Sequence, residues 1–230
     1  MKDQRLRMQI ADTGYSIVQN ALSDAECDSL IGALAEAPIQ RSRAGVRHLM
    51  ANAVISALAA ERRLLAIAEK ELGARAIPFR ATLFDKSWQA NWLVAWHQDT
   101  ALPLASSFDC PGWGPWSEKG GILYAHAPEW ALSRILALRV YLDRSTNENG
   151  PLRVVPGSHT AGVLTDEGVR EYMQTHGQVE CLVSKGGVLI MRPLLIHASS
   201  KSQSRSPRRV LHIEYTDSID LKPGIRLAVA

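Results

Sequence analysis

The sequence has few of the features that mark a secreted, membrane-bound or nucleic-acid-binding protein. Cysteine is scarce: three cysteines stand far apart in 230 residues, an odd number that excludes a disulfide framework and is typical of a reducing compartment. No apolar run reaches the length of a transmembrane helix, and no hydrophobic segment of the secretory type follows the polar start. We therefore expect a cytoplasmic protein that does not bind membranes.

A strong excess of charge is missing as well. The 26 basic and 23 acidic residues leave a net charge of +3, which is too small to predict nucleic-acid binding. One stretch is locally basic, since residues 199–209 combine four Lys or Arg with five serines. By composition alone this stretch resembles a flexible linker or a phosphorylation target, whereas the strands expected on either side favour a hairpin loop.

The chain does contain enough apolar sequence for one substantial core. Apolar residues make up 46% of it, and its length suits a single domain over residues 1–230. Residues 1–73 predict a short strand followed by helices. Ser23 and Glu26 form a capping-box pattern at one helix start, and Gly73 suits a helix end. We expect this part to be a mainly helical cover.

From residue 74 onward the pattern changes to short strands. The sequence predicts a mainly β fold with helices (α+β), whose closed or double-sheet core spans residues 74–217. Residues 101–120 are expected to form a long loop that acts as a lid or binding loop over a ligand. The expected strands are Ile77–Phe84, Trp92–Asp99, Gly121–Tyr124, Ile135–Leu142, Leu152–Val155, Val179–Val183, Val188–Met191 and Val210–Tyr215.

A His-x-Asp pair, His97 and Asp99, is the sharpest local feature. In a strand, residues two apart point to the same face, so this pair would present an imidazole beside a carboxylate. Alternation would leave Trp92, Val94 and Trp96 on the opposite, apolar face. A single pair of this kind occurs by chance and also fits a surface histidine. A strand with one apolar and one polar face is nevertheless typical of a small barrel that holds a ligand.

A second histidine, His197, follows the apolar run 187–196. A histidine at such a strand end can be an ordinary buried residue. If it lies opposite His97 and Asp99, the set becomes two histidines and one carboxylate. This set is typical of non-haem Fe(II) oxygenases, in which three coordination positions stay open.

The segment 208–215 supplies a cation, Arg208. Along this segment, apolar residues alternate with mostly polar ones. One face is apolar, and the other carries Arg208, Val210, His212 and Glu214. If the apolar face packs against the helices, Arg208 points into the barrel. A buried guanidinium needs an anion, and its planar fork suits a carboxylate. The alternative is an ordinary surface arginine at a strand start.

Taken in order, these elements resemble the phytanoyl-CoA dioxygenase family of Fe(II)/2-oxoglutarate-dependent oxygenases. The resemblance rests on Asn91–Asp99, Asn149–His159, His197 and Arg208. It implies a double-stranded β-helix (jelly-roll) core with an N-terminal helical layer packed on one sheet. It also implies Fe(II), with 2-oxoglutarate and O₂ as cosubstrates. The expected reaction hydroxylates an unactivated C–H bond of a small metabolite or natural-product intermediate and releases succinate and CO₂.

The resemblance assigns roles to individual residues. His97, Asp99 and His197 would bind Fe(II), and Arg208 would bind the distal carboxylate of 2-oxoglutarate. Arg209 is adjacent, but alternation places it on the opposite face. Further cosubstrate candidates are Lys86, Tyr141 and Arg139, and substrate or lid candidates are Trp113, Trp116, Asn91 and His159.

Two departures limit what the resemblance implies. The chain has no long basic insertion for the phosphates of an acyl-CoA, so that substrate does not carry over. The carboxylate of Asp99 favours hydroxylation or another oxidation over halogenation, because the halogenating relatives lack this ligand. Two other functions stay open: a cupin-like metal enzyme that needs neither 2-oxoglutarate nor Arg208, and a non-catalytic jelly roll that binds a small molecule. The sequence predicts neither the substrate nor the oligomeric state.

Overall fold

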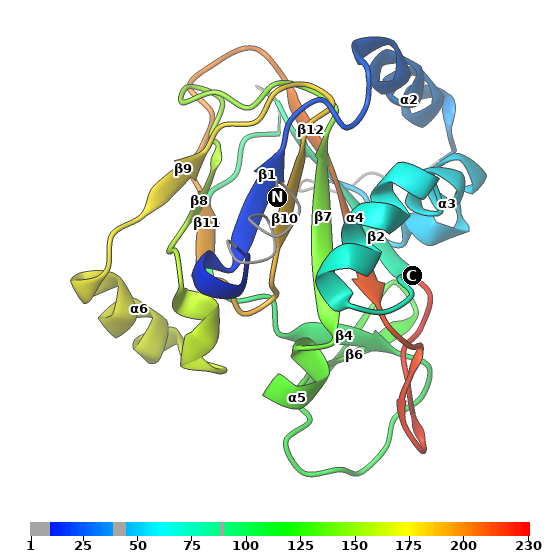
Figure 1. The fold of residues 1–230 in the computed structure, drawn as a ribbon, viewed down its shortest axis with the longest axis vertical. Helices are drawn as coiled ribbons and strands as arrows, with labels where there is room; N and C mark the ends of the chain where they lie inside the picture. Colours follow the sequence, from blue (N-terminus) through cyan, green and yellow to red (C-terminus); the bar gives the residue numbers. More distant parts are fainter. Residues whose placement is uncertain (1–9, 39–44, 88–89) are drawn as a thin grey trace.

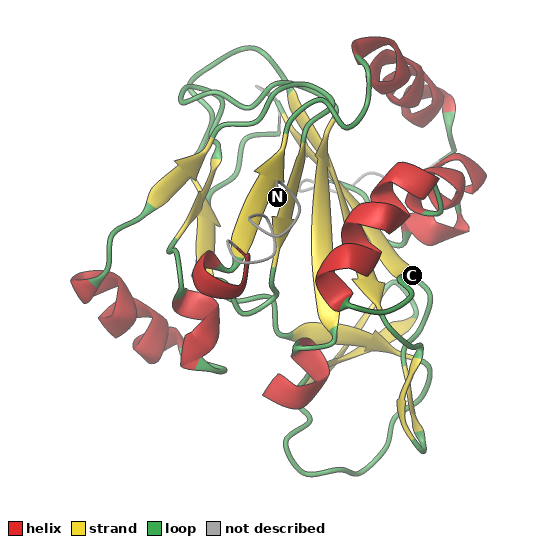
Figure 2. Ribbon diagram, viewed as in Figure 1, coloured by secondary structure: helices red, strands yellow, loops and turns green. Residues whose placement is uncertain are grey.

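The computed structural model describes residues 10–38, 45–87 and 90–230. The described chain is mainly antiparallel β-sheet, with the helices of residues 24–72 on one side and the helix of residues 166–175 on the opposite side (Figures 1 and 2). In the described part, no helix has the combination of length and hydrophobicity that crossing a membrane requires. The helices are α2 (Asp24–Glu36), α3 (Ala53–Ala59), α4 (Arg62–Leu72), α5 (Glu129–Leu132) and α6 (Asp166–Thr175), with 3-10 turns at Leu49–Ala51 and Ser158–Ala161.

Two sheets form the core and confirm the predicted jelly roll. The major sheet has the order β1-β10-β7-β12-β2, and the minor sheet has the order β3-β11-β8-β9. Apolar side chains from both sheets, among them Tyr141 and Leu152, form one buried cluster between them. The major strands are β1 (Tyr15–Val18), β2 (Ile77–Lys86), β7 (Ile135–Tyr141), β10 (Val188–Met191) and β12 (Arg208–Thr216). The minor strands are β3 (Val94–His97), β8 (Leu152–Val154), β9 (Val179–Cys181) and β11 (His197–Ser199).

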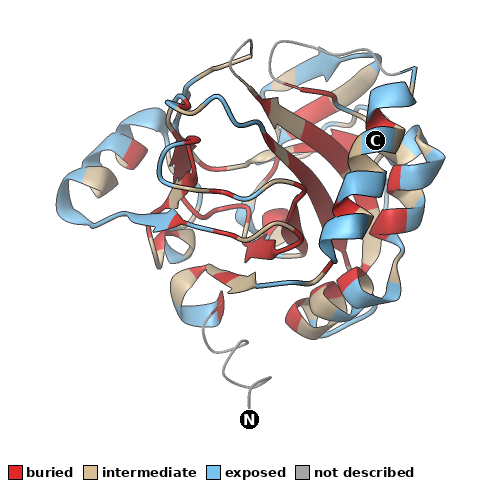
Figure 3. Ribbon diagram, turned by 90° about the horizontal axis from the view of Figure 1, so that it is seen from above, coloured by how far each residue is buried: buried red, intermediate tan, exposed pale blue. Residues whose placement is uncertain are grey.

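The helical layer covers one face of the major sheet, as expected. Leu138 of β7 and Leu211 of β12 point outward and join Leu64 of α4 in a buried cluster. Successive strand residues face opposite sides, so Arg139 and Arg208 point inward. In Figure 3 the sheet interior is buried, whereas the outer surfaces of the helices are exposed. The helices therefore seal one side of the sheet and leave the charged side facing the second sheet.

The helix signals in the first third of the chain are also confirmed. The Ser23 hydroxyl accepts from the Glu26 backbone N–H, and the Glu26 carboxylate accepts from the Ser23 N–H, which completes the capping box. Gly73 ends α4 in the left-handed conformation, with φ of 70°. The segment 52–72 contains two helices, α3 and α4.

The expected domain boundaries differ from the structure at both ends. Strand β1 lies within the predicted helical cover but forms an edge of the major sheet. Parts of that cover, residues 1–9 and 39–44, lie outside the described residues. At the other end, the chain continues past residue 217 through the hairpin β13 (Asp220–Lys222) and β14 (Ile225–Arg226). Ala230 then exchanges backbone hydrogen bonds with β2.

The prediction of a loop over residues 101–120 is wrong at both ends. Strands β4 (Ala101–Leu104) and β5 (Trp116–Lys119) flank β6 (Ile122–His126) in a separate sheet of order β4-β6-β5. Pro103 argued against a strand, but proline is tolerated on an edge strand, which is where β4 lies. Only the middle of the segment remains irregular.

The predicted alternation around His97 is also wrong. His97 pairs with His197, but Val94 pairs with Ser199, so β3 carries an extra residue and forms a β-bulge. Val94 consequently faces the same interior as His97. Trp96 instead packs against the α6 side of the minor sheet. A bulge is set by strand pairing, and the strand's own sequence does not show it.

Candidate metal and cosubstrate site

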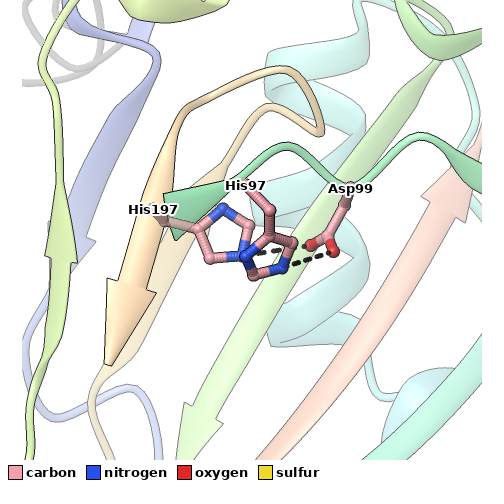
Figure 4. Close-up of side chains that lie close together, drawn as sticks. All are labelled: His97, Asp99 and His197. Carbon is pink, nitrogen blue, oxygen red and sulfur yellow. Dashed lines mark ion pairs between the residues drawn. The ribbon is translucent and has the colours of Figure 1, made fainter. Parts of the chain in front are cut away.

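The structure brings His97, Asp99 and His197 together at one end of the minor sheet (Figure 4). The two histidines are directly paired across β3 and β11, and Asp99 follows β3 by two residues. Each histidine Nε2 lies 3.5 Å from a different oxygen of the Asp99 carboxylate. The possible ligand atoms all lie within 4.8 Å of one another. Three ligands on one side leave the other side of a bound metal open.

Hydrogen bonds orient both imidazoles for metal binding. His97 Nδ1 is 2.8 Å from the Ala95 carbonyl, and His197 Nδ1 is 2.9 Å from the Leu195 carbonyl. A carbonyl only accepts, so each Nδ1 carries the proton. In the neutral imidazole this leaves the lone pair on Nε2, the atom that faces Asp99.

The local electrostatics suit a cation. Burial lowers the pKa of His197 to about 3, so this imidazole is neutral at physiological pH. Burial acts to raise the pKa of Asp99, but His197 and His97 outweigh it and hold that pKa well below its usual range. For His97, burial lowers the pKa while Asp99 raises it, with a net upward shift. The site therefore offers an ionised carboxylate and a neutral imidazole, the forms that bind a metal.

A cavity of about 100 Å³ adjoins the triad. It is lined by the triad, by Val94 and Leu152 of the minor sheet, and by residues of strands β2, β7 and β12. Arg208 is 3% exposed there and donates from Nε to the Asn149 carbonyl (3.2 Å) and from Nη2 to Ser199 Oγ (3.1 Å). Its Nη1 has no hydrogen-bond partner, and burial lowers its pKa to about 10.

Arg209 faces the other way, as strand alternation predicted. Its Nε and Nη2 donate to the two Asp143 carboxylate oxygens at 2.7 and 2.8 Å. The adjacent guanidiniums therefore differ: Arg209 is satisfied by an acid of this chain, whereas Arg208 keeps a free donor in the cavity.

Lys86 is the second cation of this cavity. It lies opposite Arg208 in the register of strands β2 and β12. Its Nζ donates to Ser199 Oγ (2.8 Å) and to the Ser200 carbonyl (2.5 Å). Burial, Arg208 and Arg139 lower its pKa to about 7. A Cβ on Gly150 would lie 2.4 Å from the Ser200 carbonyl oxygen, so glycine is needed beside this anchor.

Ser199 is a residue that the sequence reasoning missed. Its hydroxyl contacts both cavity cations and donates to the Gly150 carbonyl at 2.8 Å. The signal was present, because Ser199 follows His197 by two residues and so shares its strand face.

Tyr141 and Arg139 supply two more buried polar atoms without partners. Tyr141 Oη and Arg139 Nε are buried and make no hydrogen bond, and burial raises the pKa of Tyr141. Together with Arg208 Nη1, this makes three unpaired donors on the inner face of the major sheet. Buried polar atoms are nearly always paired, and leaving one unpaired costs about 1–3 kcal/mol. The set fits a ligand rich in acceptors, such as a dicarboxylate.

A buried chain of charged groups continues from Arg139. Arg139 Nη1 donates to His212 Nδ1 at 3.2 Å. His212 Nε2 therefore carries the proton and points to Glu214 Oε1 at 3.4 Å. Glu214 Oε2 lies 3.1 Å from Arg80 Nη1. Burial acts to lower the pKa of Arg80, but Glu214, Tyr124 and Asp99 outweigh it and the net shift is upward.

The structure does not bring Trp113 and Trp116 to the cavity. Both rings meet the Phe108 ring edge-on, each at 5.2 Å between centroids. Trp113 also contacts Trp130, with 6.1 Å between centroids. These aromatics pack in the apolar cluster beneath the β4-β6-β5 sheet, because the strands at 101–104 and 116–119 turn one face of the segment toward a core.

Asn91 and His159 have structural contacts away from the triad. Asn91 donates from Nδ2 to the Ser202 carbonyl (2.8 Å) and accepts from the Ser202 N–H (2.7 Å), which fixes the loop before β12. His159 Nε2 lies 3.2 Å from the Ala11 carbonyl and borders a different pocket, beside Arg192. Neither side chain lines the cavity at the triad.

Comparison with known proteins agrees with this geometry. The family model described as phytanoyl-CoA dioxygenase (PhyH) matches residues 10–210, which is most of the chain. The chain belongs to the PhyH family. The resemblance inferred from the sequence is thereby confirmed.

Members and neighbours of this family share its sequence or its fold at modest identity. L-proline trans-4-hydroxylase of Streptomyces griseoviridis is 25% identical over 178 residues, which cover 66% of this chain and 59% of that protein. This PhyH chain therefore spans less than two thirds of that relative. EctD from S. alaskensis has a TM-score of 0.71 at 23% identity, covering 92% of this chain and 76% of its own. The epimerase SnoN, solved with Fe³⁺ and alpha ketoglutarate, has a TM-score of 0.71 at 20% identity, covering 95% and 84%.

Proposed function

We propose that this PhyH-family chain is an Fe(II)- and 2-oxoglutarate-dependent oxygenase that hydroxylates an unactivated C–H bond of a small molecule. One observation carries the proposal: Arg139 and Arg208, each with a buried, unpaired donor, line the same cavity as the His97–Asp99–His197 triad. The triad suits a divalent metal, and the donors suit a carboxylate ligand next to it. Both requirements of this cofactor chemistry are thus met by residues of one cavity.

The residues divide the binding work between the metal and the cosubstrate. His97, Asp99 and His197 would hold the metal through two Nε2 atoms and one carboxylate. Arg208 would receive the distal carboxylate of 2-oxoglutarate on its free Nη1, with Lys86 as a second cation. Tyr141 Oη is a further unpaired donor on the inner face of the major sheet. Because each donor is already oriented by packing, little ordering is required when the ligand binds.

When bound, iron with 2-oxoglutarate supplies the oxidation, in which O₂ is consumed, succinate and CO₂ are released and one oxygen atom enters the substrate C–H bond. The chain's own contribution is to hold the cosubstrate against the metal and to keep water out. Phe84 and Leu152 supply the apolar wall for this purpose.

Two other functions are less well supported. A cupin-like metal enzyme without 2-oxoglutarate would have no use for two buried cations, one of which keeps an unpaired donor, beside the triad. A non-catalytic binding protein would not need a complete triad in which both histidines turn the unprotonated Nε2 toward Asp99. The similarity to L-proline trans-4-hydroxylase supports hydroxylation of a small molecule as the reaction class.

An anaerobic titration tests the proposal. Metal-free protein receives Fe(II) and then 2-oxoglutarate, while visible absorption and binding heat are followed. We expect an absorption band that requires both additions, and succinate formation once O₂ is admitted. Absence of the band in folded protein would overturn the proposal and favour the cupin-like or the binding function.

Two further proposals concern a lid and the location of the protein in the cell. A lid role for the irregular middle of residues 101–120 requires that its closure be detected on ligand binding, for example by hydrogen exchange. A cytoplasmic location is supported by three cysteines that form no disulfide, of which Cys27 and Cys181 are buried.

A further inference from the structure

The β4-β6-β5 sheet has two chemically different faces. One face carries Leu102 and Ala125, which join the apolar cluster with the tryptophans. On the other face Ser117 pairs with Tyr124, and Lys119 follows Ser117 by two residues. Side chains two apart in a strand share a face, so Lys119 lies on the Tyr124 face.

Tyr124 is surrounded by basic side chains. Lys119 Nζ is 4.8 Å and Arg80 Cζ is 5.5 Å from the centroid of its ring, distances typical of cation–π contacts. His48 Nε2 is 3.0 Å from Tyr124 Oη, and its ring stacks on the tyrosine at 6.1 Å. We call these four residues the Tyr124 cluster and include Arg47, whose charge acts on His48, Lys119 and Tyr124.

The positive charge of this cluster is only partly balanced. Arg80 is paired with Glu214. Within residues 10–38, 45–87 and 90–230, no carboxylate forms an ion pair with Arg47 or Lys119. Burial, then Arg80 and Arg47, lower the pKa of Lys119. The same three causes, with burial largest, lower the pKa of His48.

The cluster is held close to the metal ligands. Arg80 Nη1 donates to the Ala101 carbonyl at 3.1 Å, two residues after Asp99, and the Asp99 charge acts on Lys119. In the register of strands β2 and β12, Arg80 lies opposite Glu214 and Lys86 lies opposite Arg208. These two positions are six residues apart along both strands. Six strand residues span about 20 Å. The cluster thus lies at the opposite end of these strands from the cosubstrate cations.

We infer that the Tyr124 cluster binds an anionic group of the primary substrate, a carboxylate or a phosphate, and so selects small acidic substrates. This inference rests on the proposed function and deepens it. Like charges gathered beside a buried aromatic ring repel one another, and an anion bound beside Lys119, where the Arg47 charge also acts, removes that repulsion. Charge-assisted hydrogen bonds from two cations would then fix the substrate's position beside the metal.

Matched probes in the full-length protein test the inference. The protein is loaded with Mn(II) and saturating 2-oxoglutarate without O₂, so that the cosubstrate position is filled and no turnover occurs. Hexanoate is compared with hexanamide, and hexyl phosphate with hexanol, by isothermal titration calorimetry. We expect one anion to bind saturably and its neutral partner not to bind. The anion that binds distinguishes a carboxylate site from a phosphate site.

The variants Lys119→Gln and Arg47→Gln each remove one charge at an exposed position. Each should weaken binding of that anion about tenfold, since a hydrogen bond to a charged group is lost. Lys222→Gln is the matched control, because this exposed lysine also lies over an aromatic ring, Trp130, at 3.8 Å. It should leave binding unchanged.

The outcomes separate this inference from the proposed function. Normal 2-oxoglutarate binding with no anion binding, or with equal binding in Lys119→Gln and Arg47→Gln, overturns the inference alone. Equal binding of the acid and its amide overturns it as well. Failure to bind 2-oxoglutarate in the same loaded samples would instead overturn the proposed function, and with it the basis of this inference.

Discussion

The outer and inner faces of the major sheet are made by the same strands but do different work. On the outer face Leu138 and Leu211 are 0% exposed beneath the helices. On the inner face the neighbouring Arg139 and Arg208 are 6% and 3% exposed, and both keep an unpaired donor. Side chains on both faces are therefore buried, but those on the outer face are fully packed, whereas those on the inner face keep unpaired hydrogen-bond donors.

This difference indicates that the outer face contributes stability and that the inner face contributes the groups available to a ligand. Burying apolar groups stabilises the native state by roughly 25 cal/mol per Å², whereas burying charged groups without partners destabilises it. The outer face thereby offsets the cost of the inner one. Substitutions on the two faces should separate stability from ligand binding.

The largest effect is expected at the metal. Asp99→Ala removes the only charged ligand of the triad, so metal affinity should fall by more than the roughly 10–100-fold that loss of a supporting group costs. Calorimetric titration with Mn(II) measures this. Asp109→Ala, at an exposed carboxylate, is the control and should bind metal normally. Unchanged affinity in Asp99→Ala would contradict the assigned ligand set.

The second effect concerns stability alone. Leu138→Ala should lower the free energy of unfolding by about 3 kcal/mol, because it opens a cavity beneath the helices. Urea denaturation measures the loss, and 2-oxoglutarate affinity of the folded variant should stay as in the wild type. Val179→Ala, at a position 41% exposed on β9, should cost much less. A large drop in cosubstrate affinity in Leu138→Ala would show that the faces are not independent.

The third effect should appear only at the inner face. Arg208→Met should weaken 2-oxoglutarate binding by about 2 kcal/mol, or roughly 30-fold, because a hydrogen-bonded charge pair is lost. Arg209→Met is the matched control, since Arg209 pairs with Asp143 on the outer side. Titration of both variants in the presence of Mn(II) measures the difference. Equal losses in the two variants would remove the basis for assigning Arg208.

The smallest effect is a pH dependence at Lys86. Its pKa of about 7 means that the side chain is charged at pH 6 and largely neutral at pH 8.5. Cosubstrate affinity should therefore fall by about tenfold across this range, as the charge that attracts the carboxylate is lost. Lys86→Met should bind more weakly at pH 6 and show a flatter profile. A wild-type profile in that variant would assign the titration elsewhere.

The sequence predicted the site's members better than its shape. Alternation alone placed Arg208 inside and Arg209 outside, because the strand 208–216 is regular and pairs on both sides. The same rule failed for Val94, since a bulge in β3 turned it inward. Trp113 was predicted near the substrate, yet it packs in a core, because the strands flanking it were hidden by Pro103 and by a polar run.

The sequence by itself determined the fold family, the members of the candidate metal triad and the direction of Arg208, because each depends on local spacing or strand period. Only the tertiary structure decided which side chains of different strands and loops lie opposite one another. The opposition of Lys86 and Arg208, the sharing of Ser199 between them and the contacts of Arg80 and Lys119 with the Tyr124 ring all join strands and loops distant in the chain. Such contacts depend on register and packing between segments, and no local sequence pattern encodes them.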